Sequence, residues 1–367
     1  MIKRILKWTF LLILIGGFVW FEIAYWSSTN NCDQKIAPTN PMKAIVYCDY
    51  GLNNLKLAEI EKPTPTDEQV LVRVRAASIN PYDWHFLEGS PKVMRGMIGG
   101  LRKPKDIRLG VDFAGVVEAA GKNVTQFKVG DEVFGGRQGA LGEYVCVKAD
   151  RAIAHKPAEL SFEQAASINI AGLTALQGLR DKGKVQSGQK VLINGASGGV
   201  GTFAVQLAKI MSADVTGVCS TRNVDLVKSL GADHVIDYTK EDFTKGDQKY
   251  DAILDNVANR SLSECRKVLT PNGRFVLIGG GGANEQGWIG PLALPFKAMI
   301  YSWFVSQKMG MMMAETSQSD LTYLAELIQS GKLKPVIDRT YKLSETKDAM
   351  AYLEEGHARG KVVITLD

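Results

Sequence analysis

The sequence predicts an α/β protein with two sheets, one antiparallel and barrel-like, the other parallel and covered by helices. From Met42 onward, segments such as QVLVRVRAASIN alternate apolar and polar residues between proline and glycine turns, which is typical of antiparallel strands. After Ser161, short apolar runs alternate with helical stretches, which indicates a parallel sheet with helices on both faces. An uncharged segment, Trp8 to Phe21, precedes both parts.

The N-terminal segment predicts one transmembrane helix. Extended through Glu22 to Trp26, the segment would form a helix roughly 28 Å long, close to the thickness of the hydrocarbon core. Tryptophan and tyrosine flank the run, as in the aromatic belts of membrane helices. No small-x-small cleavage site is evident. We therefore expect an uncleaved anchor and a polar linker within residues 1–41, with a cleaved signal peptide or a soluble apolar tail as alternatives.

The antiparallel part and the parallel part each show their elements in order. Strands of the first are expected in MKAIVYCDY, LKLAEIEKP, QVLVRVRAASIN, VDFAGVVEAAG, KVGDEVFGG and GEYVCVKADRAIAHKP. The second begins with a helix in SFEQAASINIAGLTALQGL and continues with strands in KVLIN, ADVTGVCST, HVIDY, YDAILDNV and GRFVLIGG. Two late amphipathic helices, DLTYLAELIQSGKLKP and AMAYLEEGHARG, and a closing strand, KVVITLD, follow.

Composition limits the classes of function. The chain of 367 residues exceeds a single typical core, so two domains are expected. The net charge of +5 is too small and too spread out to indicate a nucleic-acid partner. The cysteines show neither metal-ligand spacing nor a disulfide framework, so we expect free thiols in a reducing compartment. They are Cys32, Cys48, Cys146, Cys219 and Cys265.

A glycine-rich turn indicates a dinucleotide site. The residues Ala196-Ser197-Gly198-Gly199-Val200-Gly201 lie between the apolar strand KVLIN and the helix TFAVQLAKI, which is the context that the fingerprint requires. Gly198 would let the backbone approach a pyrophosphate at the helix N-terminus, and Gly201 would let helix and strand pack closely. A tight turn without a ligand is the alternative.

The region about 20 residues further on favours NADPH over NADH. An NAD site usually places an acidic residue there to bind the ribose hydroxyl. This chain has Ser220-Thr221-Arg222 and no acidic residue before Asp225. Two hydroxyls and a guanidinium suit a 2′-phosphate. Alternatively, Arg222 is a solvated loop residue.

Several phrases in a fixed order resemble one family. They are LGVDFAGVV, FKVGDEVFGG, GEYV, AGLTALQGL, NGASGGVGTFAVQLAK, LGADHVIDY and GHARGKVVI. Together they resemble the medium-chain dehydrogenase/reductase superfamily over residues 42–367, and within it the zinc-free, zeta-crystallin-like quinone oxidoreductases. The resemblance implies a GroES-like β-barrel catalytic domain, residues 42–165 and 301–367, with an inserted Rossmann NADP-binding domain, residues 166–300.

Zinc members of this superfamily carry a ligand cysteine and a Gly-His-Glu segment, and this chain has neither. The corresponding segments are Ile79-Asn80-Pro81-Tyr82-Asp83 and Gly110-Val111-Asp112. Cys146 is the only cysteine in residues 80–150, so no four-cysteine lobe is present. We therefore expect no zinc and no other metal.

Without a Lewis acid, an activated double bond or a quinone is a better hydride acceptor than a simple carbonyl. The resemblance places Asn80 near the nicotinamide, where we expect it to donate a hydrogen bond to the substrate oxygen or the cofactor amide. Asp83 would order this loop, or simply cap a turn. Tyr82 is a candidate proton donor, with water as the alternative.

The resemblance also implies the residues that hold the cofactor. Around the nicotinamide and the phosphates these are Thr174, Ser197, Gly199 and Val200, together with Gly198 and Gly201 of the turn. Around the adenosine phosphate they are Ser220, Arg222 and Tyr238. Asn256 and Gly279 would line the rest of the cleft.

The sequence thus predicts a membrane-anchored, zinc-independent NADPH-dependent reductase of enones or quinones. An aldehyde or ketone reductase and a low-activity NADPH-binding sensor or scaffold are the alternatives. The residues Met299–Met313 would form a substrate wall or the edge strand of a homodimer, or simply pack between domains. The distribution of basic residues around the anchor favours export of the domain. The supply of NADPH and the free thiols favour the cytoplasmic side, which we predict.

Overall fold

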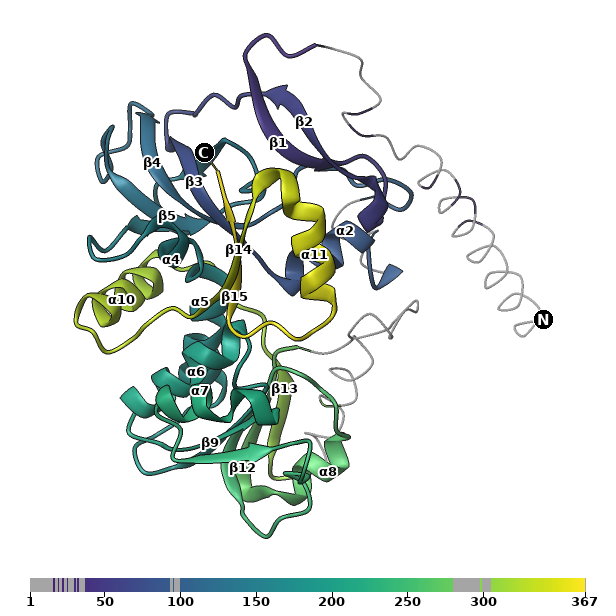
Figure 1. The fold of residues 1–367 in the computed structure, drawn as a ribbon, viewed down its shortest axis with the longest axis vertical. Coiled ribbons are helices and arrows are strands. Elements are labelled where there is room, and N and C mark those ends of the chain that lie inside the picture. The colour runs from purple at the N-terminus through teal and green to yellow at the C-terminus, as the bar shows by residue number, and fades with distance from the viewer. Residues whose placement is uncertain are drawn as a thin grey trace, which may run out of the picture.

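The structure is a computed structural model that describes residues 16, 19, 22, 25, 30, 32, 37–92, 95, 100–279, 298 and 305–366. It has two lobes (Figure 1). One contains the antiparallel strands from both ends of the chain, and the other contains the parallel sheet from its middle.

A seven-stranded sheet forms the centre of the first lobe. Its order is β14-β15-β3-β4-β5-β7, and β6 also pairs with β3. The C-terminal strand β15 pairs antiparallel with β3, so the end of the chain completes a sheet that its beginning started, as in the predicted split domain. The bounds are β3 Gln69–Ile79, β4 Asp112–Ala120, β5 Glu132–Gly136, β6 Tyr144–Lys148, β7 Ile153–His155, β14 Ile337–Lys342 and β15 Lys361–Thr365. A separate antiparallel hairpin contains β1 Pro41–Tyr47 and β2 Leu55–Glu61.

The second lobe contains a six-stranded sheet in the order β10-β9-β8-β11-β12-β13, with every pairing parallel. Counted along the chain this order is 3-2-1-4-5-6, the Rossmann order, and it confirms the predicted class of this lobe. The bounds are β8 Lys190–Asn194, β9 Asp214–Cys219, β10 His234–Asp237, β11 Tyr250–Asp255, β12 Leu269–Leu277 and β13 Lys308–Met311.

Strand β13 lies at the edge of the six-stranded sheet, although the sequence analysis assigned its residues to the catalytic domain. Its sequence, KMGM, contains no β-branched or aromatic residue, so nothing in it indicates a strand. Met311 and Met313 are exposed beside this edge. The homodimer expected through this segment stays a prediction, and residues 299–304 of the segment lie outside the described residues.

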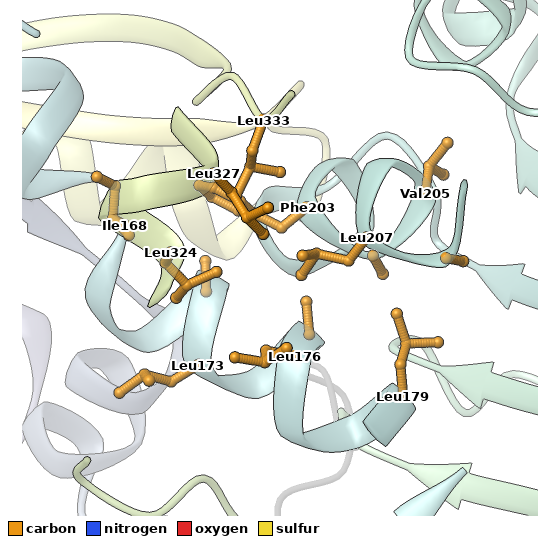
Figure 2. Packing of buried hydrophobic residues seen from close by; sticks show 14 of the residues in the cluster. Ile168, Leu173, Leu176, Leu179, Phe203, Val205, Leu207, Leu324, Leu327 and Leu333 are labelled. Carbon is orange, nitrogen blue, oxygen red and sulfur yellow. The ribbon is translucent and has the colours of Figure 1, made fainter. Parts of the chain in front are cut away.

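Helices cover the sheets and join the lobes. Helix α5 is buried on nearly all sides and packs against α6 and α10 (Figure 2). A Cβ atom on Gly172 of α5 would lie 2.9 Å from Leu324 Cδ1 of α10, so glycine lets these helices approach closely. The helices are α2 Pro81–Glu88, α4 Phe162–Ala166, α5 Asn169–Gln177, α6 Gly199–Ile210, α7 Val224–Ser229, α8 Leu262–Lys267, α10 Gln318–Gln329 and α11 Thr346–Glu354. Shorter helical turns are η2 Leu52–Asn54, η3 Gly178–Lys182, η4 Thr221–Asn223 and η6 Leu343–Glu345.

The predicted N-terminal transmembrane helix is not supported and is corrected here. Among the described residues, no helix has both the length and the apolar character needed to cross a membrane. The uncharged run spans 14 residues, or about 21 Å as a helix, and Glu22 follows it at once. Most of residues 8–26 lie outside the described residues.

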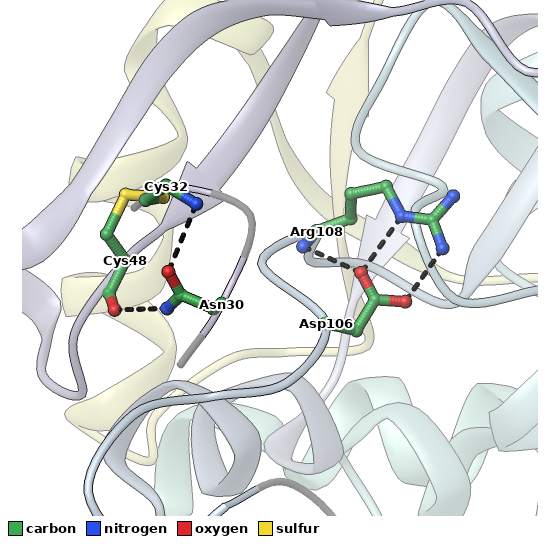
Figure 3. The surroundings of a disulfide bond; sticks show 5 residues. All are labelled: Asn30, Cys32, Cys48, Asp106 and Arg108. Atoms are coloured by element: carbon green, nitrogen blue, oxygen red, sulfur yellow. Dashed lines mark hydrogen bonds and ion pairs between the residues drawn. A yellow bond between two sulfur atoms is a disulfide. The ribbon is translucent and has the colours of Figure 1, made fainter. Parts of the chain in front are cut away.

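The expectation of free thiols throughout is also wrong. Cys32 and Cys48 form a disulfide, and the Asn30 side chain donates a hydrogen bond to the carbonyl oxygen of Cys48 at 2.6 Å (Figure 3). Their 16-residue separation in a chain without paired cysteine motifs concealed the pairing. Cys146, Cys219 and Cys265 are free.

Candidate active site

The predicted cofactor residues gather at one edge of the parallel sheet. Because all strands of this sheet run in the same direction, their carboxyl ends meet at one edge, where α/β proteins of this type bind ligands. The glycine turn follows β8, Ser220 and Arg222 follow β9, and Tyr238 follows β10. Asn256 follows β11, and Gly279 lies just beyond β12. Thr174 instead lies buried on α5.

The glycine turn fits a bound pyrophosphate. A Cβ atom on Gly198 would meet only the Gly195 carbonyl oxygen, at 3.5 Å, so the backbone here borders open space at the N-terminus of α6. On Gly201 a Cβ atom would lie 2.1 Å from the same carbonyl oxygen, so a larger residue cannot occupy this position. Gly195 has a φ of 78°, which favours glycine. The turn thus leaves room on one side for a ligand and packs tightly on the other.

The adenosine side of the cleft is organised by Asn223, a residue that the sequence analysis did not single out. Its Nδ2 atom donates to Ser197 Oγ at 3.0 Å and to Ser220 Oγ at 3.1 Å, which ties the glycine turn to the loop after β9. The Arg222 guanidinium donates to the carbonyl oxygen of His357 at 2.7 Å and remains exposed. A 2′-phosphate would therefore meet a guanidinium that is already oriented by one backbone oxygen.

An acidic residue that contacts this loop, Asp237 at the end of β10, is already engaged. Thr221 Oγ1 donates to it at 2.6 Å, and the Thr239 hydroxyl and the Lys240 ammonium group also bind it. These partners, Thr221 first, hold the pKa of the Asp237 carboxyl well below its usual range. Asp237 therefore does not substitute for the missing ribose-binding acid.

The two remaining predicted cofactor residues, Asn256 and Gly279, lie at the carboxyl ends of β11 and β12. Asn256 Nδ2 donates to the Asn194 carbonyl oxygen at 2.8 Å, and its buried Oδ1 atom has no partner among the described residues. A Cβ atom on Gly279 would lie 2.2 Å from the Asn256 carbonyl oxygen, so β11 and β12 end close together. Among the described residues nothing donates to the Asn256 side-chain oxygen, so this atom is free to accept a hydrogen bond.

A buried ion pair lies where the first lobe faces this edge. In the seven-stranded sheet Val362 of β15 pairs with Ile79 of β3, and Ser78 of β3 pairs with Asp112 of β4. This register places Lys361, Asn80 and Asp112 side by side on three neighbouring strands or their ends. The Lys361 Nζ atom lies 3.3 Å from Asp112 Oδ2, and both side chains are almost fully buried.

Hydrogen bonds satisfy nearly every polar atom of this pair. The Lys361 ammonium group donates to the Asn80 side-chain oxygen, to Asp112 Oδ2 and to the Ile79 carbonyl oxygen. The partners of Asp112 are Ser78 Oγ at 3.0 Å, Asn80 Nδ2 at 3.0 Å, Asn169 Nδ2 at 2.8 Å and the backbone N–H of Ile170 at 3.1 Å. A buried charge pair with this many partners forms one rigid unit.

The predicted catalytic residue Asn80 is therefore held by the protein itself. Its side-chain oxygen accepts from Lys361, and one of its two amide protons is donated to Asp112. The other contacts of Nδ2, with Asp83 Oδ2 and the Ser78 carbonyl oxygen, are 3.4 Å long. Only the proton with these weak contacts is available to a substrate or cofactor oxygen, and that donation stays a prediction.

The same ion pair contacts the glycine turn. A Cβ atom on Gly199 would lie 3.0 Å from Lys361 Cδ and 3.6 Å from the Gly360 carbonyl oxygen. Gly360 itself has a φ of 106°, which places the chain before Lys361 in a conformation that favours glycine. The aliphatic stem of Lys361 thus packs on the cofactor-binding turn while its ammonium group holds Asn80.

Asp83 lies in the first turn of α2 and is a buried carboxyl with a raised pKa. Its Oδ2 atom accepts a hydrogen bond from the Asn80 backbone N–H at 2.8 Å, so it caps the helix behind Pro81. Burial, and then the nearby Asp112 charge, raise the pKa of Asp83 to about 7. Its Oδ1 atom is buried without a partner among the described residues. Both predicted roles, ordering the loop and capping the turn, fit this geometry.

Tyr82 points away from the ion pair. Its side chain is partly exposed and stacks against Phe86 one turn further along α2, with the ring centroids 4.4 Å apart. Burial and the neighbouring Asp83 raise the pKa of the Tyr82 hydroxyl to about 12. Tyr82 therefore stays protonated at neutral pH.

Four residues of this network were not predicted as site residues: Ser78, Asp112, Asn169 and Lys361. A signal for two of them was present. Asp112 interrupts the apolar stretch VDFAGVV, and Lys361 begins the apolar strand KVVITL, so one acidic and one basic residue each lie where a buried strand is expected. Buried charges are usually paired, and this rule suggests that the two residues meet.

Comparison with known proteins agrees with this architecture. Residues 66–158 match the family model described as alcohol dehydrogenase GroES-like domain, and residues 230–364 match the one described as zinc-binding dehydrogenase. The chain is 35% identical over 341 residues to Quinone-oxidoreductase QR1, chloroplastic, of Triphysaria versicolor, an alignment that covers 88% of this chain and 98% of that protein. The chain belongs to the medium-chain dehydrogenase/reductase superfamily.

Two further comparisons narrow its place in this superfamily. The chain is 34% identical to NAD(P)H oxidoreductase RTN4IP1, mitochondrial, of Bos taurus, over 91% of this chain and 92% of that protein. The solved structure of the quinone oxidoreductase from Coxiella burnetii superposes with a TM-score of 0.78 at 32% identity, over 89% of this chain and all of that one. This medium-chain reductase is an NAD(P)H-dependent oxidoreductase with quinone oxidoreductase-like relatives.

One matching family model is described as zinc-binding, so we asked whether the residues of this chain could bind a metal ion. Among the residues that the structure describes, no group of three or more His, Cys, Asp or Glu side chains is arranged to hold a metal ion. The position of the Gly-His-Glu segment is occupied by Asp112, whose two oxygens are taken up by Lys361, Asn169 and other donors. Zinc independence stays a prediction.

We expect Lys361→Met to lower the free energy of unfolding by about 3–5 kcal/mol, because it leaves the Asp112 carboxylate buried without its cation. The double variant Lys361→Met/Asp112→Asn should recover part of this loss, and the exposed control Lys332→Met should change it by less than about 0.5 kcal/mol. Urea denaturation of the four proteins measures this. If Lys361→Met lowers the free energy of unfolding no more than the control does, the ion pair does not contribute to stability as we expect.

The raised pKa of Asp83 predicts how stability depends on pH. Between the ordinary carboxyl pKa near 4 and about 7, the native state binds the proton that the unfolded state has lost. The free energy of unfolding should therefore fall as pH rises through this window, by up to about 1.4 kcal/mol per pH unit. The Asp83→Asn variant keeps the acceptor for the Asn80 N–H but cannot ionise. Its free energy of unfolding, relative to that of wild type, should therefore increase with pH.

Denaturation of wild type, Asp83→Asn and the exposed control Asp150→Asn at several values between pH 4.5 and pH 8 tests this expectation. The difference between wild type and Asp83→Asn should change with pH, and the difference between wild type and the control should not. A constant difference for Asp83→Asn would show that this carboxyl is ionised across the whole range.

Proposed function

We propose that this oxidoreductase is an NADPH-dependent quinone reductase that also accepts enones. The reaction is quinone + NADPH + H⁺ → hydroquinone + NADP⁺. The observation that carries the proposal is the contact of the Lys361 stem with Gly199, which brings the buried Asn80 network against the cofactor turn. The kinship with quinone oxidoreductases supports the choice of substrate.

The cofactor residues have separate tasks in this proposal. NADPH, when bound, supplies the hydride. The open backbone at Gly198 and the N-terminus of α6 receive the pyrophosphate, and the hydroxyl of Ser220 and the guanidinium of Arg222 receive the 2′-phosphate. A carboxamide has both a donor N–H and an acceptor oxygen. In this proposal its N–H donates to the buried side-chain oxygen of Asn256, and its oxygen accepts the weakly bonded amide proton of Asn80.

The hydrogen bonds of Lys361 favour an activated acceptor over a simple ketone or aldehyde. An ammonium group has three protons, and here they go to the Ile79 carbonyl oxygen, the Asn80 side chain and Asp112. Lys361 therefore has no proton left to polarise an unactivated carbonyl. A quinone needs less polarisation because its own ring stabilises the added charge.

Asp83 is the proton store in this scheme. It is protonated below about pH 7, and its Oδ1 atom has no competing partner among the described residues. The Tyr82 hydroxyl also stays protonated and its side chain is partly exposed, so Tyr82 is a second proton donor of this loop. A product oxygen that gains negative charge takes a proton from one of these groups or from water.

We expect Arg222→Ala to weaken NADPH binding about tenfold or more and to leave NADH binding nearly unchanged, because only NADPH carries the 2′-phosphate. Fluorescence titration of both cofactors with wild type, Arg222→Ala and the exposed control Arg151→Ala measures this. An unchanged ratio of the two affinities in Arg222→Ala would remove Arg222 from the phosphate site.

The proposed activity is tested by NADPH oxidation with a panel of quinones, enones, aldehydes and ketones. We expect the highest kcat/KM with quinones, lower values with enones, and the lowest with aldehydes and ketones. Preferred turnover of aldehydes or ketones would support the second enzyme class. Tight NADPH binding with no turnover on any compound would overturn the proposal in favour of a sensor or scaffold.

A further inference from the structure

Two side chains beside the cofactor cleft stand at helix N-caps without capping. Ser220 precedes η4 and Asn223 precedes α7, and neither side chain accepts a hydrogen bond from the backbone N–H groups of the turn that follows. Serine and asparagine are favoured at this position because their side-chain oxygen usually accepts such a bond. Both side chains are therefore directed elsewhere.

Other helices of the same chain show the usual arrangement. Ser161 before α4, Ser261 before α8 and Ser317 before α10 each accept from the backbone N–H of the third residue that follows. The exception lies directly after β9, at the edge of the sheet where the predicted cofactor residues gather. The loss of two caps at this place calls for an explanation in terms of the site.

Asn223 points at the hydroxyls of two serines from different loops. Its Nδ2 atom donates to Ser197 Oγ at 3.0 Å and to Ser220 Oγ at 3.1 Å. Asn223 is 4% exposed, and its Oδ1 atom is buried without a partner among the described residues, so the amide binds through its nitrogen. An amide nitrogen has two protons, and both are used here. The two serine oxygens thus flank one buried nitrogen.

These bonds fix the direction of the serine protons. A hydroxyl oxygen that accepts from an N–H keeps its own proton pointed away from that N–H, because two protons cannot share the line between the two atoms. Neither Ser197 Oγ nor Ser220 Oγ donates to another described residue. Both hydroxyl protons are therefore available to an acceptor on a ligand.

We propose that Asn223 is a positioning residue, that its amide sets the Ser197 and Ser220 hydroxyls as donors toward the cleft, and that both hydroxyls donate to the 2′-phosphate of NADPH. The inference rests on the proposed use of NADPH and adds to it the residue that directs the phosphate donors. The phosphate dianion offers acceptors only, whereas the ribose hydroxyl of NADH also has a proton to place. Two hydroxyls held as donors thus favour the phosphate.

The charges around the two serines suit an anion. The Arg222 guanidinium is exposed and is oriented by the His357 carbonyl oxygen. The Asp237 carboxylate already binds Thr221 Oγ1 at 2.6 Å and Lys240 Nζ at 3.1 Å, so its negative charge is compensated. The loop after β9 therefore offers a guanidinium together with the two neutral hydroxyl donors.

Two serine variants form a matched pair. Ser220→Ala should raise the Kd for NADPH about tenfold, because a hydrogen bond to a charged group is lost, and should leave the Kd for NADH nearly unchanged. Ser261→Ala removes a serine that caps α8, so it should lower the midpoint of urea denaturation and leave both Kd values unchanged. Fluorescence titration of both cofactors measures the Kd values.

Replacing Asn223 by aspartate reverses both bonds. A carboxylate has no proton to donate, so the serine hydroxyls turn their protons toward it and away from the phosphate. Asn223→Asp should therefore raise the Kd for NADPH by more than about tenfold. The added negative charge contributes to this increase, and a double-variant cycle separates the two effects.

The cycle combines Asn223→Asp with Ser220→Ala. Ser220→Ala should raise the Kd for NADPH about tenfold in wild type but less than about twofold in Asn223→Asp, where the hydroxyl no longer faces the phosphate. The repulsion from the carboxylate is present in both members of the second comparison and cancels. Ser197→Ala should give the same result in a second cycle. If Asn223→Asp does not fold, Asn223→Ala provides a cycle without added charge, and the effect of Ser220→Ala should again be smaller than in wild type.

The outcomes separate this inference from the function on which it rests. An equal effect of Ser220→Ala in both backgrounds would show that Asn223 only ties the two loops together, and the NADPH-dependent reductase would stand. If Ser197→Ala raises the Kd values of NADPH and NADH alike, its hydroxyl binds a phosphate common to both cofactors, and the shared 2′-phosphate site is wrong. If wild type binds NADH as tightly as NADPH, the inference and the proposed choice of cofactor both fail. The titrations need no substrate, so they decide the inference even if no quinone is reduced.

Discussion

The arrangement of this site depends on the buried ion pair of Lys361 and Asp112. Burying two charges costs several kcal/mol each, and the pair is tolerated only because other donors and acceptors surround it. Here the surrounding groups are Ser78, Asn80 and Asn169. Truncating one partner would leave an uncompensated charge inside the protein, so the pair fixes the positions of all the groups bound to it.

Strand register explains why these residues meet. Lys361 lies 249 positions from Asp112 in the chain, and only the antiparallel pairing of β15 with β3, and of β3 with β4, brings them together. The first lobe is built from both ends of the chain, and its C-terminal strand β15 supplies the cation of the site, Lys361. The packing of α5 between α6 and α10 gives this arrangement a rigid support (Figure 2).

A short loop before β15 connects the two ends of the cofactor cleft. The carbonyl oxygen of His357 holds Arg222 on the adenosine side, and Gly360 and Lys361 contact Gly199 at the glycine turn. Only four positions separate His357 from Lys361. Arg222, which we propose binds the 2′-phosphate, and the Lys361 network that holds Asn80 thus contact the same short piece of backbone.

Much of the fold could be predicted from the sequence, because alternation of apolar residues and the glycine turn at Gly198 are local patterns. The places of Ser220, Tyr238 and Asn256 could be predicted for the same reason, since each follows a strand of one parallel sheet, and their binding of a cofactor stays a prediction. The ion pair and the disulfide of Cys32 with Cys48 could not, because each depends on which distant segments become neighbours. The N-terminal anchor was predicted from an apolar run with flanking aromatic residues, but among the described residues no helix is both long and apolar enough to cross a membrane.

The account rests on the claim that the Lys361 network and the glycine turn enclose one cofactor between them. A crystal structure with NADP⁺ bound tests this most directly. We expect the nicotinamide between Gly199 and the Asn80 side chain, with the Lys361–Asp112 pair intact and the 2′-phosphate bound to Arg222. A nicotinamide bound away from Asn80, or a broken ion pair in the complex, would contradict the account.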